Sequence, residues 1–275
     1  MLSSSENEFN VNLHEKKIYS QNGEDGIIEF IFSKIGTTNK FSVEFGVGDG
    51  FECNTVYLLE KKNWKGLMMD YGADQQIQWE NVVKKVASPS FLFSPNGMQR
   101  SAKFLQKIMK RSKRSANFKR DIKIEKVTAE NIQQLFHKYN VPKNFDLLSI
   151  DIDYNDYWVW KAITDYAPRV VVIEYNSSIP PTESKVVPYD PNASWDGTNY
   201  FGASLLALKN LGLSKGYTLV GCESRGVNAF FVQSGLVEGI KIKDIEYLYR
   251  PPKYGQIING AHIGHPPSNK KMIEI

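Results

Sequence analysis

Residues 41–55, FSVEFGVGDGFECNT, decide the fold of this chain. The largely apolar run 41–45 is typical of a buried strand. The next glycines stand at alternate positions: Gly46, Gly48 and Gly50. Asn54 or Thr55 can cap a following helix, so the stretch predicts a strand, a tight turn and a helix N-terminus that faces the turn. Such a unit can hold a cofactor.

The spacing of the glycines discriminates between cofactors. A dinucleotide site needs G-x-G-x-x-G, and here the third glycine comes one residue early. Glu44 lies in the strand before the first glycine, where its carboxylate would repel an anion and hold a cationic amino group. An acid followed by three alternate glycines therefore suits a ligand that combines an amino acid with a nucleoside.

This pattern resembles the first motif of the class I S-adenosylmethionine-dependent methyltransferases. The resemblance implies an α/β, Rossmann-like fold: a seven-stranded, mostly parallel sheet with a C-terminal antiparallel hairpin and helices on both faces. It also implies S-adenosyl-L-methionine (SAM) as the cofactor. Asp70 ends the next strand-like run, twenty residues beyond Gly50 (70 − 50), where the family places the carboxylate that binds the ribose hydroxyls. The expected cofactor contacts are Gln21, Glu44, Gly46, Gly48, Gly50, Asn54, Asp70 and Asp151.

Two further stretches are similar to the FkbM-type methyltransferases, which O-methylate small molecules and glycans. They are YSQNGEDGIIEFIF at 19–32 and TVYLLEKKNWKG at 55–66. The likeness extends over residues 19–233, apart from 82–120. It implies methyl transfer to a hydroxyl of a small molecule, a sugar or a glycan, nucleotide-linked sugars included.

Length and composition indicate one globular domain over residues 1–275. Of its residues, 41% are hydrophobic and 23% are charged, and the net charge of +4 names no partner by itself. The chain has no apolar run near the roughly 20 residues of a membrane span, and its polar start lacks a signal-peptide core. With only two cysteines, these features predict a cytoplasmic protein. The sequence leaves the oligomeric state open, a homo-oligomer included.

A basic insertion at 82–120 departs from the compact family plan. Its charges would attract phosphate, a nucleotide-sugar or an anionic glycan, so the acceptor could carry a phosphate. A solvated helix face is the plainer explanation. Its basic residues are not regularly interleaved with aromatic residues, so a nucleic-acid partner is not expected.

Acidic residues follow two neighbouring strands that the sequence predicts to be buried on both faces. Asp151 and Asp153 follow the first strand, and Glu174 and Asn176 end the second. Because active sites of open α/β sheets lie at the carboxyl ends of the strands, these four oxygen donors predict a site for Mg²⁺. The arrangement is similar to that of metal-dependent small-molecule O-methyltransferases. The alternative is transfer without metal, in which Asp151 is the base and Asp156 caps the next helix.

Other candidates lie in the second half of the chain. Asp151, Asp153 and, in the tail 236–275, His262 are the candidate catalytic groups. The loop 177–200 is long and rich in proline and aromatic residues, which favours an acceptor-binding role. The candidate acceptor contacts are Tyr154, Glu174, Asn176, Tyr189, Trp195 and Tyr200.

Two other functions remain open at this stage. A glycosyltransferase could use Asp151-Ile152-Asp153 as its metal-binding motif, although that fold gives no role to Glu44 or Asp70. A non-catalytic SAM-binding module could instead dock partners through the basic insertion.

Overall fold

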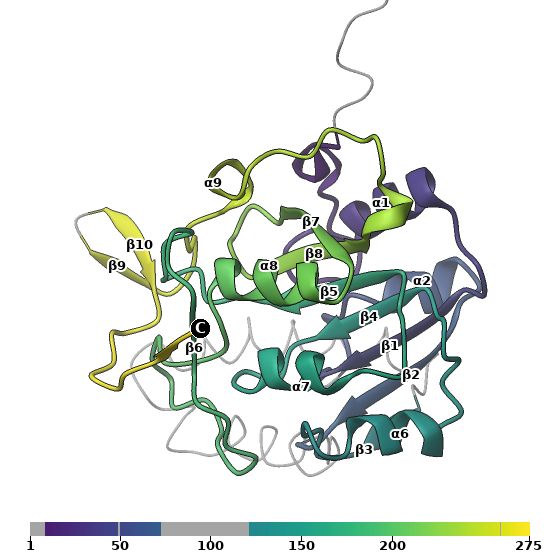
Figure 1. The fold of residues 1–275 in the computed structure, drawn as a ribbon, viewed down its shortest axis with the longest axis horizontal. Helices are drawn as coiled ribbons and strands as arrows, with labels where there is room; N and C mark the ends of the chain where they lie inside the picture. Colours follow the sequence, from purple (N-terminus) through teal and green to yellow (C-terminus); the bar gives the residue numbers. More distant parts are fainter. Residues whose placement is uncertain (1–8, 49, 73–120, 259) are drawn as a thin grey trace, which may run out of the picture.

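The computed structural model describes residues 9–48, 50–72, 121–258 and 260–275. Their centre is a seven-stranded sheet with the order β3-β2-β1-β4-β5-β8-β7 (Figure 1). The first five strands are parallel, and β8 runs antiparallel to both β5 and β7. This topology confirms the predicted Rossmann-like methyltransferase fold with its C-terminal hairpin. The strands are β1 (Phe41–Phe45), β2 (Lys65–Asp70), β3 (Ile122–Ile124), β4 (Leu147–Ile150), β5 (Val170–Glu174), β7 (Tyr217–Cys222) and β8 (Asn228–Gln233).

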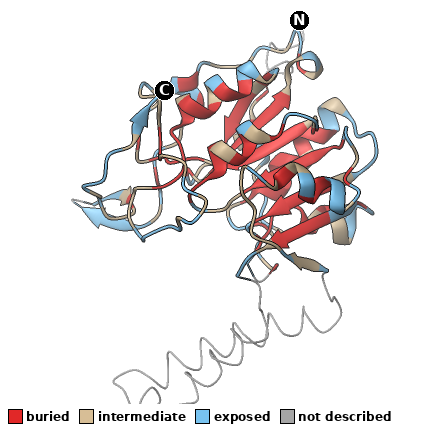
Figure 2. Ribbon diagram, turned by 60° about the horizontal axis from the view of Figure 1, so that its bottom comes forward, coloured by how far each residue is buried: buried red, intermediate tan, exposed pale blue. Residues whose placement is uncertain are grey.

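The central strands are buried on both faces. In β4, Leu147 belongs to the core on one side of the sheet and Leu148 to the core on the other, because successive side chains of a strand point to opposite faces. Val170 and Val171 of β5 divide in the same way. Figure 2 shows the buried strands between more exposed helices. The uninterrupted apolar runs of the sequence follow from this two-sided burial.

Helices cover both faces of the sheet (Figure 1). One core contains side chains of α6 (Ile132–Lys138), α7 (Asp156–Ala162) and α8 (Leu205–Ser214). The other contains side chains of η1 (Val11–His14), α1 (Glu24–Ile35) and α2 (Val56–Lys61). The helical spacing of the isoleucines from Ile27 to Ile35 predicts α1 with these bounds, and Gly36, with a positive φ of 67°, follows its last residue.

Two expected elements are shorter in the structure. The alternating residues 122–127 predict a third strand of that length, but β3 ends at Ile124, and the residues after it turn toward the site described below. The apolar run within 169–176 predicts a fifth strand of that length, whereas β5 ends at Glu174. The basic insertion 82–120 and the helices that the sequence predicts over 74–86 and 99–110 lie outside the described residues.

The loop 177–200 and the C-terminal tail are joined to each other. β6 (Lys185–Val186) in the loop pairs with β11 (Ile273–Glu274) at the end of the tail. The tail's Tyr249 donates its hydroxyl hydrogen bond to the carbonyl of Ser177, 2.6 Å away. The tail also contains η2 (Ser234–Leu236), α9 (Ile245–Leu248), β9 (Gln256–Ile258) and β10 (Ala261–Gly264). Loop and tail together therefore enclose one end of the sheet.

Asp146 organises the opposite end of the sheet. Its fully buried carboxylate accepts backbone hydrogen bonds from Thr38, Asn39 and Lys40 and forms an ion pair with Arg169, N to O 3.1 Å. Burial raises the pKa of the Asp146 carboxyl, but the donors from Thr38, Lys40 and Arg169 outweigh it and leave the pKa below its usual value. Arg169 also donates to the carbonyls of residues 35 and 36, which fixes the end of α1.

Asp146→Asn should lower the free energy of unfolding by about 3–5 kcal/mol, because the substitution leaves the buried Arg169 charge without its partner. The matched control is Asp165→Asn, since Asp165 pairs with Lys143 at 3.7 Å and both side chains are well exposed. The control should cost less than about 1 kcal/mol. Urea unfolding of both variants checks this, and equal losses would contradict it. Because the pKa of Asp146 is lowered, its contribution should fade as the pH falls below the ordinary aspartate pKa.

Among the described residues, none of the helices has the length and apolar character that crossing a membrane would require.

Candidate functional site

Glu44 in β1 holds the start of α2. One carboxylate oxygen accepts from the backbone N–H of Asn54 at 2.7 Å, and the other accepts from the N–H and hydroxyl of Thr55 at 3.0 and 2.5 Å. Burial raises the pKa of the Glu44 carboxyl, and the donors of Thr55, Asn54 and Ser149 oppose that rise. Both oxygens are occupied by donors of the chain itself. The structure thus gives Glu44 a role in building the turn, while direct contact with a ligand's amino group stays a prediction.

The glycine turn lies against the end of β4. Gly46 has a φ of 80°, and a Cβ added to it would meet the carbonyl oxygen of Asp151 at 1.3 Å, so only glycine fits there. A Cβ on Gly48 would meet nothing within 4 Å. Asp70, at the end of β2, accepts the N–H of Gly48 at 2.8 Å and that of Gly72 at 2.7 Å. Asp70 therefore joins the turn to the neighbouring strand.

A cavity of about 310 Å³ opens beside this turn. Gly46, Gly48 and Asp70 form one wall, and Val127 and Ile152 add apolar surface. The remaining lining comes from the ends of β2 and β4, the segment after β3, and loop 177–200: Met69, Tyr71, Glu125, Lys126, Asp151, Asp153, Asn155, Pro191, Ala193, Ser194 and Trp195. We refer to it as the turn cavity.

A second cavity, of about 350 Å³, adjoins the first and shares Asp151, Asp153 and Trp195 with it. We refer to it as the tail cavity, because the C-terminal tail supplies part of its wall. Its other lining residues are Gln21, Asn22, Glu174, Phe201, Arg225, Val227, Tyr254, Gly255 and His265. Two ligands bound in these cavities would meet at the shared aspartates.

Three carboxylates converge at the carboxyl ends of β4 and β5. Asp151, Asp156 and Glu174 each offer an oxygen, and these oxygens lie within 4.8 Å of one another. Oδ1 of Asp156 accepts the backbone N–H of Ile152 at 2.8 Å, and its buried Oδ2 has no hydrogen-bond partner among the described residues. The buried Oε2 of Glu174 has none there either. Buried oxygens without donors at such close range fit a divalent cation, whose charge would offset their repulsion.

The electrostatics of the cluster agree with this geometry. Burial and then the nearby negative charges of Asp153 and Asp156 raise the pKa of Asp151. Burial raises the pKa of Asp156 to about 7. Burial, followed by the charge of Asp151, raises the pKa of Glu174 well above its ordinary value. Without a cation, the cluster therefore retains protons that separate carboxylates would lose.

Two of the predicted metal ligands do not join the cluster. Asp153 has a φ of 64°, which turns the chain away after Asp151, and it lies between the two cavities. Burial and the negative charge of Asp70 raise its pKa. Asn176 follows the end of β5, and its amide donates to the carbonyls of Asn199 and Phe201 at 2.8 and 3.0 Å. The structure thus gives Asn176 a role in bracing the loop, and the third carboxylate of the cluster is that of Asp156.

Other predicted site residues lie away from their expected places. Gln21 lines the tail cavity instead of the turn cavity, and the Asn54 amide donates to the hydroxyl of Ser149 at 3.0 Å. Among the expected acceptor contacts, Trp195 lines both cavities and Glu174 lines the tail cavity. Tyr154, Tyr189 and Tyr200 line neither cavity.

The three tyrosines contact protein groups instead. Tyr154 and Tyr200 pack edge to face with ring centroids 6.1 Å apart, and burial raises the pKa of Tyr154 to about 12. Tyr189 donates a hydrogen bond to Glu130.

The tail places His265, and not His262, at the site. His262 is exposed on β10 and lines neither cavity. His265 lines the tail cavity, where burial lowers its pKa and favours the neutral imidazole. Its ring contacts those of Trp195, Phe201 and Tyr254, with centroids 4.4, 5.7 and 5.2 Å away.

Sequence reasoning missed Asp156, Arg225 and Tyr254 as parts of the site. Asp156 reads as a helix cap, and Arg225 lies in the turn of the β7–β8 hairpin. No motif marks Arg225 or Tyr254, since only the folded hairpin and tail bring them to the cavity.

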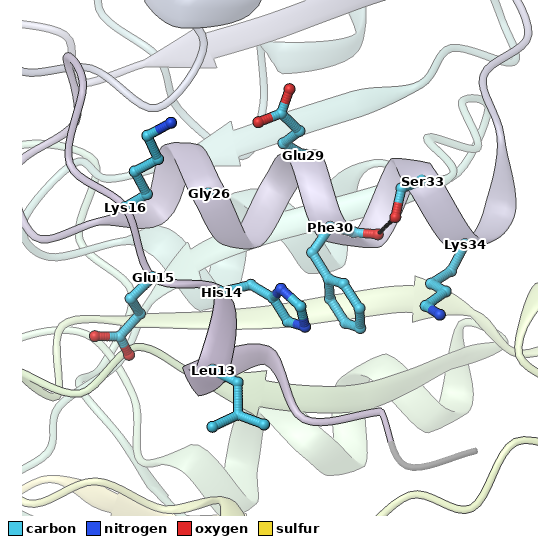
Figure 3. Close-up of a pocket in the computed structure, with 9 residues that line it drawn as sticks. All are labelled: Leu13, His14, Glu15, Lys16, Gly26, Glu29, Phe30, Ser33 and Lys34. Carbon is cyan, nitrogen blue, oxygen red and sulfur yellow. Dashed lines mark hydrogen bonds between the residues drawn. The ribbon is translucent and has the colours of Figure 1, made fainter. Parts of the chain in front are cut away.

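A separate cavity of about 610 Å³ lies over η1 and α1 (Figure 3). There the rings of His14 and Phe30 stack with centroids 3.8 Å apart. Glu15 accepts hydrogen bonds from Ser224, and Glu29 pairs with Lys62, so both acids that line it serve the packing of the chain. This cavity contains no carboxylate cluster like that of the sheet edge.

Comparison with known proteins gives matches among solved structures alone. No family model matches the chain, and no curated protein matches it. Among solved structures, the crystal structure of TnmH matches 70% of this chain at 12% identity, with a TM-score of 0.33. The match spans about half of the TnmH chain, 49%. The fold assignment rests on the sheet order described above.

The raised pKa of Asp156 predicts that the stability of the protein depends on pH. Its folded-state pKa of about 7 exceeds that of an unfolded aspartate, so between these values the folded state holds the proton more tightly. Without a divalent cation, the free energy of unfolding should therefore fall from about pH 5 to about pH 8, by roughly 1–4 kcal/mol. Asp156→Asn should reduce this fall, whereas the exposed Asp121→Asn should preserve it. Urea unfolding in EDTA measures both, and a wild-type stability that rises over this range would contradict the prediction.

Proposed function

We propose that this protein is a SAM-dependent O-methyltransferase of the FkbM type that acts on a hydroxyl of a small molecule or sugar. The observation that carries the proposal is the meeting of the two cavities at Asp151 and Asp153. One cavity is walled by the glycine turn and Asp70, and the other contains Glu174 of the carboxylate cluster. A methyltransferase needs this arrangement, because donor and acceptor must approach each other in line.

The turn cavity has the features that SAM requires. Gly48 leaves space for a ligand over the turn, and the Asp70 carboxylate beside it can accept hydrogen bonds from ribose hydroxyls. Val127 and Ile152 offer apolar surface for an adenine ring. The acidic edge at Asp151 and Asp153 would favour a ligand whose amino and sulfonium groups are cationic.

In this proposal the protein mainly positions the donor and the acceptor and excludes water from the site. Bound SAM would supply a methyl group on a sulfonium, which is already an activated donor. Loop 177–200 and the tail enclose the tail cavity and hold the acceptor against Asp151. The acceptor hydroxyl would lose its proton to a carboxylate of the cluster, and Asp151 is the member of the cluster that lines both cavities.

A divalent cation such as Mg²⁺ belongs to the proposal. Asp151, Asp156 and Glu174 would hold it, and it would lower the pKa of an acceptor hydroxyl bound beside it. The unpartnered oxygens of Asp156 and Glu174 support this ligand set.

The two other functions gain no specific support. A glycosyltransferase motif would use Asp151 and Asp153 together, but the cluster contains Asp151 with Asp156 and Glu174. A non-catalytic module would not need the carboxylates of the tail cavity. Docking of phosphate-bearing compounds by residues 82–120 and self-association stay predictions from the sequence.

Asp70→Ala should weaken binding of S-adenosylhomocysteine roughly 10- to 100-fold, because charge-assisted hydrogen bonds contribute about 1.5–3 kcal/mol each. The control is Asp121→Ala, which removes an exposed carboxylate at the start of the strand next to β2. Calorimetric titration of both variants and the wild type tests this. Failure of the wild type to bind S-adenosylhomocysteine would contradict the proposed function.

Measuring divalent-cation binding distinguishes the ligand set with Asp156 from the set with Asp153 that the sequence predicted. Asp156→Asn should weaken Mn²⁺ binding at least roughly 10-fold, because it removes a ligand charge while its amide oxygen can still accept the N–H of Ile152. Asp153→Asn should change the affinity much less. Electron paramagnetic resonance of free Mn²⁺ gives both affinities. A larger loss in Asp153→Asn than in Asp156→Asn would favour the Asp151–Asp153 motif instead.

A further inference from the structure

The tail cavity combines one cationic side chain with aromatic walls. Among the described residues that line it, Arg225 is the only lysine or arginine, and burial lowers the pKa of His265, which favours the neutral imidazole. Trp195, Phe201 and Tyr254 surround the His265 ring and give the cavity flat apolar surfaces. At about 350 Å³ it lies at the small end of ligand pockets, which suits a ring compound of about monosaccharide size.

The backbone of Arg225 is fixed on both sides. Its N–H donates to the Glu223 carboxylate at 2.6 Å, and its carbonyl accepts the N–H of Lys253 at 2.8 Å. The next residue, Gly226, packs so closely that an added Cβ would lie 2.7 Å from the carbonyl oxygen of Arg250. The hairpin turn is therefore held against the tail, and this fixes the position from which the Arg225 side chain extends.

The guanidinium of Arg225, in contrast, has no hydrogen bond or ion pair within the described part of the chain. The two other described arginines are satisfied by the protein: Arg169 donates to Asp146 and to carbonyls, and Arg250 donates to carbonyls and to Asn12. The Arg225 side chain is exposed at the cavity, so its five N–H donors remain available to a ligand.

Sheet register places this cation beside the carboxylate cluster. Glu174 is paired with Asn228 across β5 and β8, and Arg225 precedes Asn228 by three residues in the turn beyond that edge. A ligand in the tail cavity can therefore reach both Glu174 and Arg225. One end of the site is acidic and the other is basic. This difference in charge would orient a ligand that has a hydroxyl at one end and an anionic group at the other.

We propose that the acceptor is an anionic hydroxylated ring compound, such as an acidic sugar, whose carboxylate or phosphate is bound by Arg225 while a hydroxyl faces Asp151 and Glu174. This inference rests on the proposed function and names the acceptor class of the same site. A carboxylate and a phosphate each present two oxygens that a guanidinium can bind with two parallel hydrogen bonds. The aromatic walls would hold the ring between the two ends.

The test measures binding to the protein saturated with S-adenosylhomocysteine and Mg²⁺. The probes are D-glucuronate and glucose 6-phosphate, with neutral glucose as the comparison. The wild type should bind at least one of the two anionic probes roughly 10- to 100-fold more tightly than glucose, as expected for charge-assisted hydrogen bonds. A preference for glucuronate would identify the anion as a carboxylate, and a preference for glucose 6-phosphate as a phosphate.

Arg225→Gln should abolish the preference for the anionic probe without changing the affinity for S-adenosylhomocysteine. Arg225→Lys should keep part of it, since it retains the charge but not the paired donors. The control Lys65→Gln removes an exposed cation at the amino end of β2, away from the carboxyl ends of the strands. This control should keep the full preference for the anionic probe. Equal binding of anionic and neutral probes, no binding of either anion, or an unchanged preference in Arg225→Gln would overturn the inference. A protein that does not bind S-adenosylhomocysteine would fail the proposed function instead, so the two failures are distinguishable.

Discussion

The site depends on the hydrogen bonds that the buried Glu44 carboxylate accepts from the backbone of Asn54 and Thr55. They join the middle of β1 to the start of α2 and so close the glycine turn between them. Asp70 fixes the same turn from the next strand by accepting the N–H of Gly48. A buried carboxylate is costly unless donors surround it, so the turn and the carboxylate stabilise each other. The space beside the turn is open because the protein's own groups satisfy the backbone around it.

The carboxylates of the cluster, in contrast to Glu44, are not surrounded by hydrogen-bond donors. Asp151, Asp156 and Glu174 approach one another where the protein provides few donors, and two of their oxygens have no partner. Such an arrangement destabilises the fold unless protons or a cation compensate for it. Strain of this kind is found at functional sites, since a ligand can supply what the chain lacks. Glu44 is thus a carboxylate that builds the site, whereas the carboxylates of the cluster are available for the roles proposed above.

Much of the fold could be predicted from local patterns. The bounds of α1 followed from its apolar spacing and Gly36, and the presence of β4 and β5 followed from apolar runs typical of strands buried on both faces. Local patterns predicted which edge of the sheet carries the site, but not all of its residues. Residues i and i+2 share a face within a strand, which would have placed Asn176 beside Glu174, but β5 ends at Glu174 and Asn176 turns into the loop. Asp153 leaves the pattern for the same reason, with its positive φ. Asp156 and Arg225 enter the site through contacts between distant segments, which no local pattern contains.

A crystal structure of the protein with S-adenosylhomocysteine and Mn²⁺ would test the central claim most directly. We expect the nucleoside in the turn cavity, with its ribose at Asp70 and its sulfur toward Asp151. We also expect an anomalous Mn²⁺ peak among Asp151, Asp156 and Glu174. A nucleoside bound elsewhere, or a Mn²⁺ ion held by Asp151 and Asp153 without Asp156, would contradict it.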